Sequence, residues 1–216
     1  CPYHAWSYGL NGSLVGLPQQ EKLYPSMDKS EWSLIEVAQL VSYKGSIWAT
    51  WDEKAPPFLD YLGGAKEHLD LTLDHRDGSE GGSEAFVGVH KWLVPCNWKL
   101  PSENFLGDTY HNISHRSVDL VGIGPSAAQG TKGRRDGELD DAQHLWVSFP
   151  GGHGVHSAMK AADAEYHEAF KDNPIVAEYY RHCHEERKRR LGDKSRLLPF
   201  VGTIFPNTSY HGGQPR

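Results

Sequence analysis

Residues 97–115 read NWKLPSENFLGDTYHNISH, and this stretch carries the most informative pattern in the chain. Asp108, His111 and His115 are spaced by three and four residues, so a helix would place all three side chains on one face. Neutral imidazoles are the commonest ligands of transition metals, and two of them one turn apart can bind the same ion. We therefore predict a helix from about Pro101 to His115 that carries a metal site.

A site with two histidines needs at least one further ligand. Two histidines and one carboxylate, with open positions, are typical of non-heme Fe(II) oxygenases. The carboxylate could come from Asp108, from an acid within 136–141, or from a residue beyond Arg216. Asp108 lies in line with both histidines, which suits a hydrogen bond to a ring N–H better than direct ligation. The alternative is that the two histidines only pack or face solvent.

A second metal-type pattern opens the chain, where Cys1 and His4 are three residues apart. A thiolate and an imidazole suit zinc, or an iron–sulfur cluster in which histidines replace two cysteines on one iron. An incidental cysteine is the alternative. The following Trp6 and Tyr8 favour ligation, because aromatic side chains can screen a cluster from water.

The composition narrows the class of protein. The chain has 216 residues, 38% of them hydrophobic, and a formal net charge of −6, which argues against a nucleic-acid partner. No apolar run approaches the ~20 residues that a membrane span needs. The cysteines are few and scattered, so we expect a reducing, cytoplasmic location. The chain begins at Cys1 without an initiator Met, and we expect it to be an internal piece of a longer polypeptide.

Turn residues and periodicity suggest two regions, which meet at Pro56-Pro57. In the first region we predict two hairpins. One turns at Asn11-Gly12, and the other has strands at Leu34–Leu40 and Ser46–Trp51 around Lys44-Gly45.

In the second region we predict helices, strands and one polar loop over 121–140. Cys96 should be buried, and His153 and His156 should line a pocket or occupy a turn. The predicted helices are Phe58–Leu73, which could also be irregular, and Asp163–Leu191, which Gly192 ends; the predicted strands are Phe86–Trp98, His144–Phe149 and Leu197–Phe205.

These motifs resemble one known family. Cys1-Pro2-Tyr3-His4-Ala5-Trp6 resembles the second half of a Rieske [2Fe–2S] motif, C-x-x-H-G-W. Residues 97–111 resemble the catalytic motif of Rieske non-heme iron aromatic ring-hydroxylating dioxygenases, large (alpha) subunit, and Ile204-Phe205-Pro206-Asn207 resembles a downstream strand of the same domain. The resemblance implies an α+β fold: 1–55 would be the C-terminal part of a β-rich Rieske domain, and 56–216 the N-terminal part of a helix-grip catalytic domain with an antiparallel sheet.

The resemblance also implies roles for individual residues. Cys1 and His4 would bind the Rieske cluster, and His111 and His115 would bind the mononuclear Fe(II), with a third ligand beyond Arg216. Asp108 would form the acidic bridge between an iron-site histidine and a Rieske histidine of the neighbouring subunit. Asn104 would lie beside the iron and Phe105 would form a wall of the substrate pocket.

The implied activity is cis-dihydroxylation of an aromatic ring with O2 and electrons from NAD(P)H. The implied partners are a ferredoxin or a reductase, and a trimer of alpha subunits with or without beta subunits, in a bacterial cytoplasm. By itself the chain should be inactive, because it carries half of the cluster ligands and two of the three iron ligands.

Two departures and two alternatives accompany this assignment. Ala5 stands where glycine is usual, which matters only if the position has a positive φ, and three residues separate His111 from His115 where relatives have four or five. One alternative keeps the fold but performs aromatic monooxygenation or O-demethylation. The other is a zinc-binding or metal-free helix-grip binding module. The substrate is not determined by these motifs.

Overall fold

The computed structural model describes residues 2–84, 88–106, 108, 114, 117, 120–121, 143–159 and 170–211. The chain divides into two compact units, Cys1–Ala55 and Pro56–Arg216. Helices and antiparallel sheets occur together, which confirms the predicted α+β class at this level. Within the described ranges, no helix has both the length and the apolar character that crossing a membrane requires.

The first unit begins with a short hairpin of β1 (Ser7–Tyr8) and β2 (Leu14–Gly16). Its turn is confirmed where Asn11-Gly12 predicted it: the Gly12 N–H donates to the Gly9 carbonyl at 2.9 Å, and Gly12 has a φ of 82°. Two short helical elements follow, α1 (Gln20–Leu23) and the 3-10 helix η1 (Lys29–Trp32). The side chain of Asp28 caps η1 by accepting the Ser30 N–H.

A second hairpin in this unit pairs β3 (Gln39–Tyr43) with β4 (Ser46–Thr50). Lys44 and Gly45 form its two-residue turn, with φ values of 46° and 79°, as type I′ geometry requires. The prediction of a turn here is confirmed, but the first strand was wrongly placed at Leu34–Leu40. The tight turn pairs Tyr43 with Ser46, and this pairing brings the strand up to the turn.

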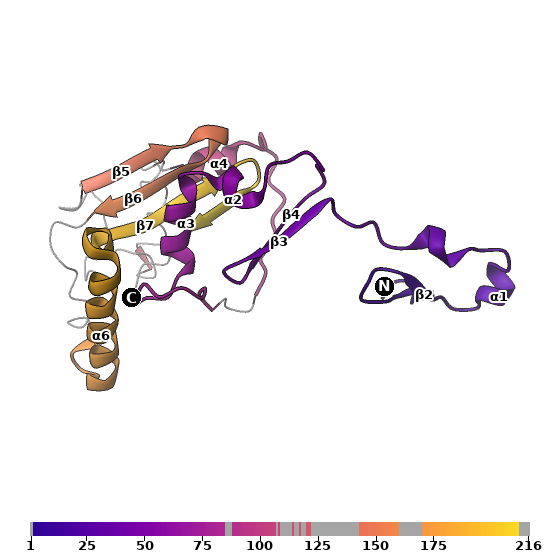
Figure 1. Cartoon of the computed structure of the whole chain (residues 1–216), viewed down its shortest axis with the longest axis horizontal. Coiled ribbons are helices and arrows are strands. Elements are labelled where there is room, and N and C mark those ends of the chain that lie inside the picture. The colour runs from indigo at the N-terminus through magenta and orange to yellow at the C-terminus, as the bar shows by residue number, and fades with distance from the viewer. Residues whose placement is uncertain are drawn as a thin grey trace. The chain divides into compact units, whose positions relative to one another are not determined.

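The second unit contains a four-stranded antiparallel sheet in the order β5-β6-β7-β8 (Figure 1). The strands predicted near His144 and Leu197 are confirmed, whereas the second and fourth strands were not predicted. Pro199 lies in an inner strand opposite Ser157, next to the register shift after His156, where its missing N–H is tolerated. The strands are β5 (Gln143–Ser148), β6 (Gly154–Met159), β7 (Leu197–Ile204) and β8 (Thr208–His211).

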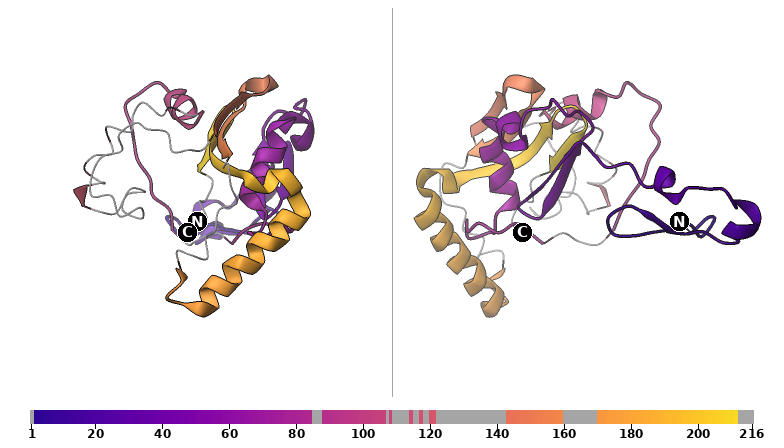
Figure 2. Two further views of the ribbon diagram at one scale, coloured as in Figure 1. Left: turned by 90° about the vertical axis from the view of Figure 1, so that its left-hand side faces the viewer. Right: turned by 45° about the vertical axis from the view of Figure 1, so that its right-hand side comes forward.

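Helices lie on both faces of this sheet. Two of them, α2 (Phe58–Leu62) and α3 (Ala65–Leu73), confirm the predicted helical region, which is broken at Gly63. A short helix, α4 (Leu100–Phe105), contacts β7 and β8, while α3 contacts β6 and β7. Figure 2 (left) shows α3 and α4 on opposite sides of the sheet.

The last helix, α6 (Pro174–Leu191), ends at Gly192, as predicted. Its start was predicted too early, because the described residues 170–173 are not α-helical. The side chain of Asn173 accepts the Val176 N–H at 3.3 Å and caps the first turn, and Pro174 follows it at a position that favours proline. A short 3-10 helix, η6 (Gly192–Arg196), leads into β7.

The stretch before α4 corrects two predictions. Residues 88–98 contain no strand, although Phe86–Trp98 was predicted as one. Trp92 and Leu93 are largely exposed, and Cys96 is exposed instead of buried. An apolar run becomes a strand only when a neighbouring strand supplies its hydrogen bonds, and the run at 88–98 forms no such ladder.

Candidate functional site

The proposed catalytic motif begins on α4, which is six residues long. Pro101 lies in its first turn, where its missing N–H costs nothing. At its end the Leu106 N–H is shared between the carbonyls of Ser102 and Glu103, at 3.0 and 3.2 Å, an arrangement common at helix termini. A continuous helix from Pro101 to His115 is therefore wrong, since Asp108 lies outside any regular element.

The sequence-predicted site residues divide between described and undescribed positions. Asn104 and Asp108 are exposed, and Phe105 is half-buried. The Asp108 N–H donates to the Asn104 carbonyl at 3.4 Å, so these residues lie on consecutive turns of the backbone. His111 and His115 lie outside the described residues, as does the predicted loop at 121–140 apart from Val121, so the shared metal site remains a prediction.

Two polar contacts hold α4 against the sheet. The Thr203 hydroxyl on β7 donates to the Ser102 carbonyl at 3.1 Å, and the Ser102 hydroxyl donates to the Pro206 carbonyl at 3.3 Å. Trp98, just before the helix, has its ring 5.7 Å from that of Phe205. The end of β7 and the β7–β8 turn therefore hold α4 in place on the sheet.

His153 joins the same turn to α2. Its side chain is 1% exposed; Nε2 lies 2.8 Å from the Tyr61 carbonyl, and the Phe205 N–H donates to Nδ1 at 3.0 Å. These partners require a neutral ring with its proton on Nε2. The Tyr61 hydroxyl closes the cluster by donating to the Phe205 carbonyl at 2.5 Å. His153 was predicted to line a pocket or occupy a turn; it is a buried connector.

A second pair of histidines, one on β5 and one on β6, is in contact, and this contact was not predicted from the sequence. His144 Nδ1 and His156 Nε2 are 2.7 Å apart. The His156 ring stacks between Trp146 and Phe200, with centroids 4.6 and 5.3 Å away. Burial, and secondarily His144, lowers the pKa of His156 to about 4, so its ring is neutral at physiological pH. The only indication in the sequence was that His144 and Trp146 are two residues apart in a predicted strand, which places both side chains on the same face of the sheet.

In the first unit, His4 lies in an exposed turn with its ring 4.1 Å from that of Tyr3. Ala5 has a φ of 59°, so the position where the family motif has glycine does adopt the left-handed conformation. Cys1 lies outside the described residues. The imidazole of His4 is accessible to a metal, which is what a cluster ligand at this position requires.

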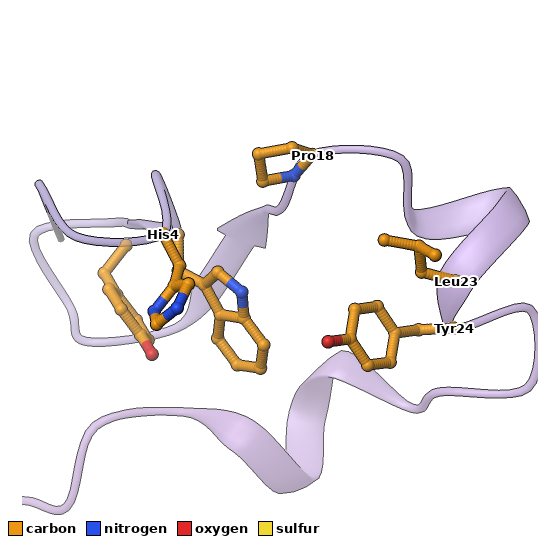
Figure 3. Close-up of a pocket in the computed structure, with 6 residues that line it drawn as sticks. His4, Pro18, Leu23 and Tyr24 are labelled. Atoms are coloured by element: carbon orange, nitrogen blue, oxygen red, sulfur yellow. The ribbon is translucent and has the colours of Figure 1, made fainter.

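A pocket of about 520 Å³ adjoins His4. In Figure 3 the Tyr24 hydroxyl points into this pocket, whose wall also includes Pro18 and Leu23. Trp6 lines it too and has its ring edge-on to Tyr24 and Trp32, with centroids 6.3 and 5.8 Å away. An aromatic surface of this kind can exclude water beside a metal ligand.

The described residues hold no cluster of three or more His, Cys, Asp or Glu side chains with metal-binding geometry. This result does not extend to Cys1, His111 or His115. The donor atoms of the predicted ligands nevertheless fit the two metal groups. Two imidazoles suit a mononuclear iron, and a thiolate with an imidazole suits a Rieske cluster.

Comparisons with known proteins bear on the family. No protein-family model matches the chain. It is 36% identical over 220 residues to the biphenyl 2,3-dioxygenase subunit alpha of Rhodococcus jostii (strain RHA1), covering 99% of this chain and 45% of that protein. It is 35% identical over 225 residues to a benzene 1,2-dioxygenase subunit alpha of Pseudomonas putida, covering 99% and 46%.

A solved structure gives the same result. A naphthalene 1,2-dioxygenase mutant bound to phenanthrene superimposes with a TM-score of 0.69 and 30% identity, covering 98% of this chain and 46% of that one. By sequence and by fold, the chain is related along nearly its whole length to the alpha subunits of aromatic ring-hydroxylating dioxygenases, as the two motifs predicted. It spans about half the length of the curated relatives it matches.

Proposed function

We propose that this chain is part of the large subunit of a terminal oxygenase that cis-dihydroxylates an aromatic ring. The observation that carries the proposal is the similarity over 99% of the chain to alpha subunits named as benzene and biphenyl dioxygenases. In the proposed reaction one O2 is split and both of its atoms form C–O bonds to adjacent ring carbons. NAD(P)H supplies the two electrons, and NAD(P)H and solvent supply the two protons.

The proposal includes two metal cofactors. A bound Rieske cluster would deliver single electrons, and a bound Fe(II) would activate O2. Cys1 and His4 would hold the cluster, and His111 and His115 the iron. The exposed His4 imidazole and the aromatic pocket beside it support the first assignment.

The residues around α4 would position the substrate and the iron ligands. Asp108 would accept hydrogen bonds from an iron-site histidine and from a Rieske histidine of the neighbouring subunit, and its exposure supports this role. Asn104 would lie beside the iron. Phe105 would form part of the apolar wall that excludes water from the reacting oxygen.

The domain assignment follows from the same relation. We assign 1–55 to the end of a Rieske domain and 56–216 to the first part of a helix-grip catalytic domain. The division of the chain after Ala55 supports this assignment. Electrons would come from NAD(P)H through a reductase or ferredoxin to a trimer of alpha subunits, with or without beta subunits, in a bacterial cytoplasm.

Product analysis tests the reaction. The oxygenase that carries this chain, supplied with its electron donors and ¹⁸O2, should convert benzene, biphenyl or naphthalene to a cis-diol that contains two labelled oxygens. A phenol with one labelled oxygen, or release of an aldehyde from a methoxy-substituted ring, would instead support monooxygenation or O-demethylation. Iron and acid-labile sulfide analysis tests the class: a folded protein that lacks both would be the zinc-binding or metal-free module.

A further inference from the structure

Two hydroxyl groups, that of half-buried Ser209 and that of buried Thr203, connect β8 and β7 to α4. The side-chain oxygens of Ser209 and Thr203 are 3.0 Å apart, and the Thr203 hydroxyl lies 3.1 Å from the Ser102 carbonyl. Thr203 is 0% exposed and Ser102 is 6% exposed. The carbonyl can only accept, so the single proton of Thr203 is donated to it. Ser209 must then donate its proton to Thr203.

The Ser102 carbonyl accepts two hydrogen bonds, one from Thr203 and one from within α4. The bond from within α4 is donated by the Leu106 N–H at 3.0 Å and closes the last turn of the helix. Asn104 and Phe105 belong to that turn, and the Asp108 N–H donates to the Asn104 carbonyl. Thr203 therefore donates to the Ser102 carbonyl, which also forms the last turn of the helix that carries Asn104 and Phe105.

A second contact from the sheet acts on the same turn. Gly154 on β6 faces Leu106, and a Cβ atom at Gly154 would overlap the end of the Leu106 side chain. A helix of six residues is unstable by itself, so its position depends on tertiary contacts. Thr203 holds this turn through a hydrogen bond, and Gly154 allows its close approach.

We propose that Thr203 is a positioning residue for the iron site, which holds the last turn of α4 so that Asn104 and Asp108 are correctly placed. The inference rests on the proposed function, because it assumes that these two side chains serve the iron. Thr203 itself acts only through Ser102. Its hydroxyl is directional, so a side chain of the same size without the proton donor leaves the turn less constrained.

The test is Thr203→Val in the holoenzyme, with the affinity for Fe(II) measured by competition with a chelator. Loss of a hydrogen-bond partner of a metal ligand commonly weakens metal binding by ~10 to 100-fold. Thr203 acts one step further from the metal, so we expect a decrease near the lower end of this range, ~10-fold. The ligand-field absorption of the Co(II)-substituted protein should shift as well. Thr203→Ser keeps the donor and should restore both affinity and spectrum.

Thr72→Val is the matched control. The Thr72 hydroxyl also donates to a helix carbonyl, that of His68 at 3.3 Å, but it does so within α3 on the other side of the sheet. Thr72 is half-buried and its bond lies within its own helix, so this variant should keep the Fe(II) affinity and the Co(II) spectrum with little change in thermal stability. The comparison separates loss of the Thr203–Ser102 bond from loss of a threonine hydroxyl in general.

The outcomes are distinct. Unchanged Fe(II) affinity and spectrum in Thr203→Val, or equal weakening in Thr72→Val, would overturn the inference and leave the proposed function intact. Absence of mononuclear iron from the wild-type holoenzyme would overturn both. If Thr203→Val does not fold, Thr203→Ala removes the same donor with a smaller side chain, and unchanged iron binding in that variant would also overturn the inference.

Discussion

The two units of the chain are stabilised in different ways. In Cys1–Ala55 the structure describes one buried apolar side chain, Leu14, and the remaining order comes from tight turns and ring contacts around Trp6. In Pro56–Arg216 the described buried apolar side chains form a core between the sheet and its helices: Leu62, Ala65, Leu69, Val155, Ala158, Cys183, Leu197, Leu198 and Ile204.

This difference shows that turn-forming residues and the burial of apolar side chains contribute separately to the stability of a fold. The β3–β4 hairpin has correct turn chemistry, yet Leu40 and Ile47 on one of its faces are 66% and 73% exposed. A two-stranded hairpin without a covered face is marginally stable. We therefore expect the first unit to open locally and the second to unfold cooperatively, and four predictions test this expectation.

The largest effect is expected in the core of the second unit. Leu62 is 0% exposed, and Leu62→Ala should lower the free energy of unfolding of this unit by ~2–5 kcal/mol because it removes buried methyl groups and leaves a cavity. Hydrogen exchange followed by mass spectrometry should show faster exchange throughout the sheet and no change in Cys1–Ala55. Leu14→Ala is the control, and its effect should stay within the first hairpin. Equal, chain-wide effects of the two variants would contradict the division.

A smaller effect is expected from crowding the sheet. Tyr210 lies over Gly202 in the neighbouring strand, and a Cβ atom at Gly202 would overlap its ring. Gly202→Ala should destabilise the second unit by ~1–3 kcal/mol because the ring must move. Gly16 in β2 has no neighbour within 4 Å of such an atom, so Gly16→Ala should change stability by less than ~0.5 kcal/mol. Urea titration measures both changes, and equal shifts of the midpoint from the wild-type value in the two variants would argue against a tightly packed sheet.

The pH dependence of stability should also differ between the units. Unfolded His156 takes up a proton near its ordinary pKa of 6.5, whereas the folded side chain does so only at about 4. Between these values the unfolded chain binds more protons, so the stabilisation is present above pH 6.5 and is lost as the pH falls toward 4. The urea midpoint of the second unit should fall over this window, and His156→Gln should make the slope shallower. Burial also lowers the pKa of His68, which accounts for the slope that remains; an unchanged slope in His156→Gln would contradict the role of His156.

The smallest effect concerns Ala5. Its φ of 59° is unfavourable for a residue with a Cβ, so Ala5→Gly should stabilise the first unit by ~1 kcal/mol. Lys44 has a φ of 46° in the β3–β4 turn, and Lys44→Gly is a matched substitution there. Hydrogen exchange of the two hairpins, measured separately, gives the result. No slowing of exchange near His4 in Ala5→Gly would mean that the strain is relieved elsewhere.

The positions of tight turns and of one helix end were predicted well from the sequence. Asn11-Gly12, Lys44-Gly45 and Gly192 each require or favour a backbone conformation that few residues adopt, so each fixes a turn or a helix end without tertiary help. The motif from Asn97 to His111 predicted the similarity to dioxygenase alpha subunits, which the relatives confirm. We expected alanine in place of glycine at position 5 to matter only if φ is positive there, and Ala5 has a φ of 59°.

Features that depend on distant partners were predicted poorly. The apolar run at 88–98 has strand-like residues but forms no ladder, and β8 forms because β7 lies beside it. The predicted helix through Asp108 ends at Phe105, where the Leu106 N–H is shared between the Ser102 and Glu103 carbonyls, and the Ser102 carbonyl also accepts from Thr203 on β7. His153 looked like a pocket or turn residue because its partners, Tyr61 and Phe205, are far away in the sequence.

By itself, the sequence determined the turns, the α+β class and the similarity to dioxygenase alpha subunits, because these depend on residue types at short spacing. The tertiary structure decided which side chains are buried and which backbone groups are shared. Only folding brings Thr203 to Ser102 and His144 to His156, since contacts across a sheet depend on register. The position of α4, and with it Asn104 and Asp108, therefore follows from the sheet, because a six-residue helix has too few internal bonds to determine its own place.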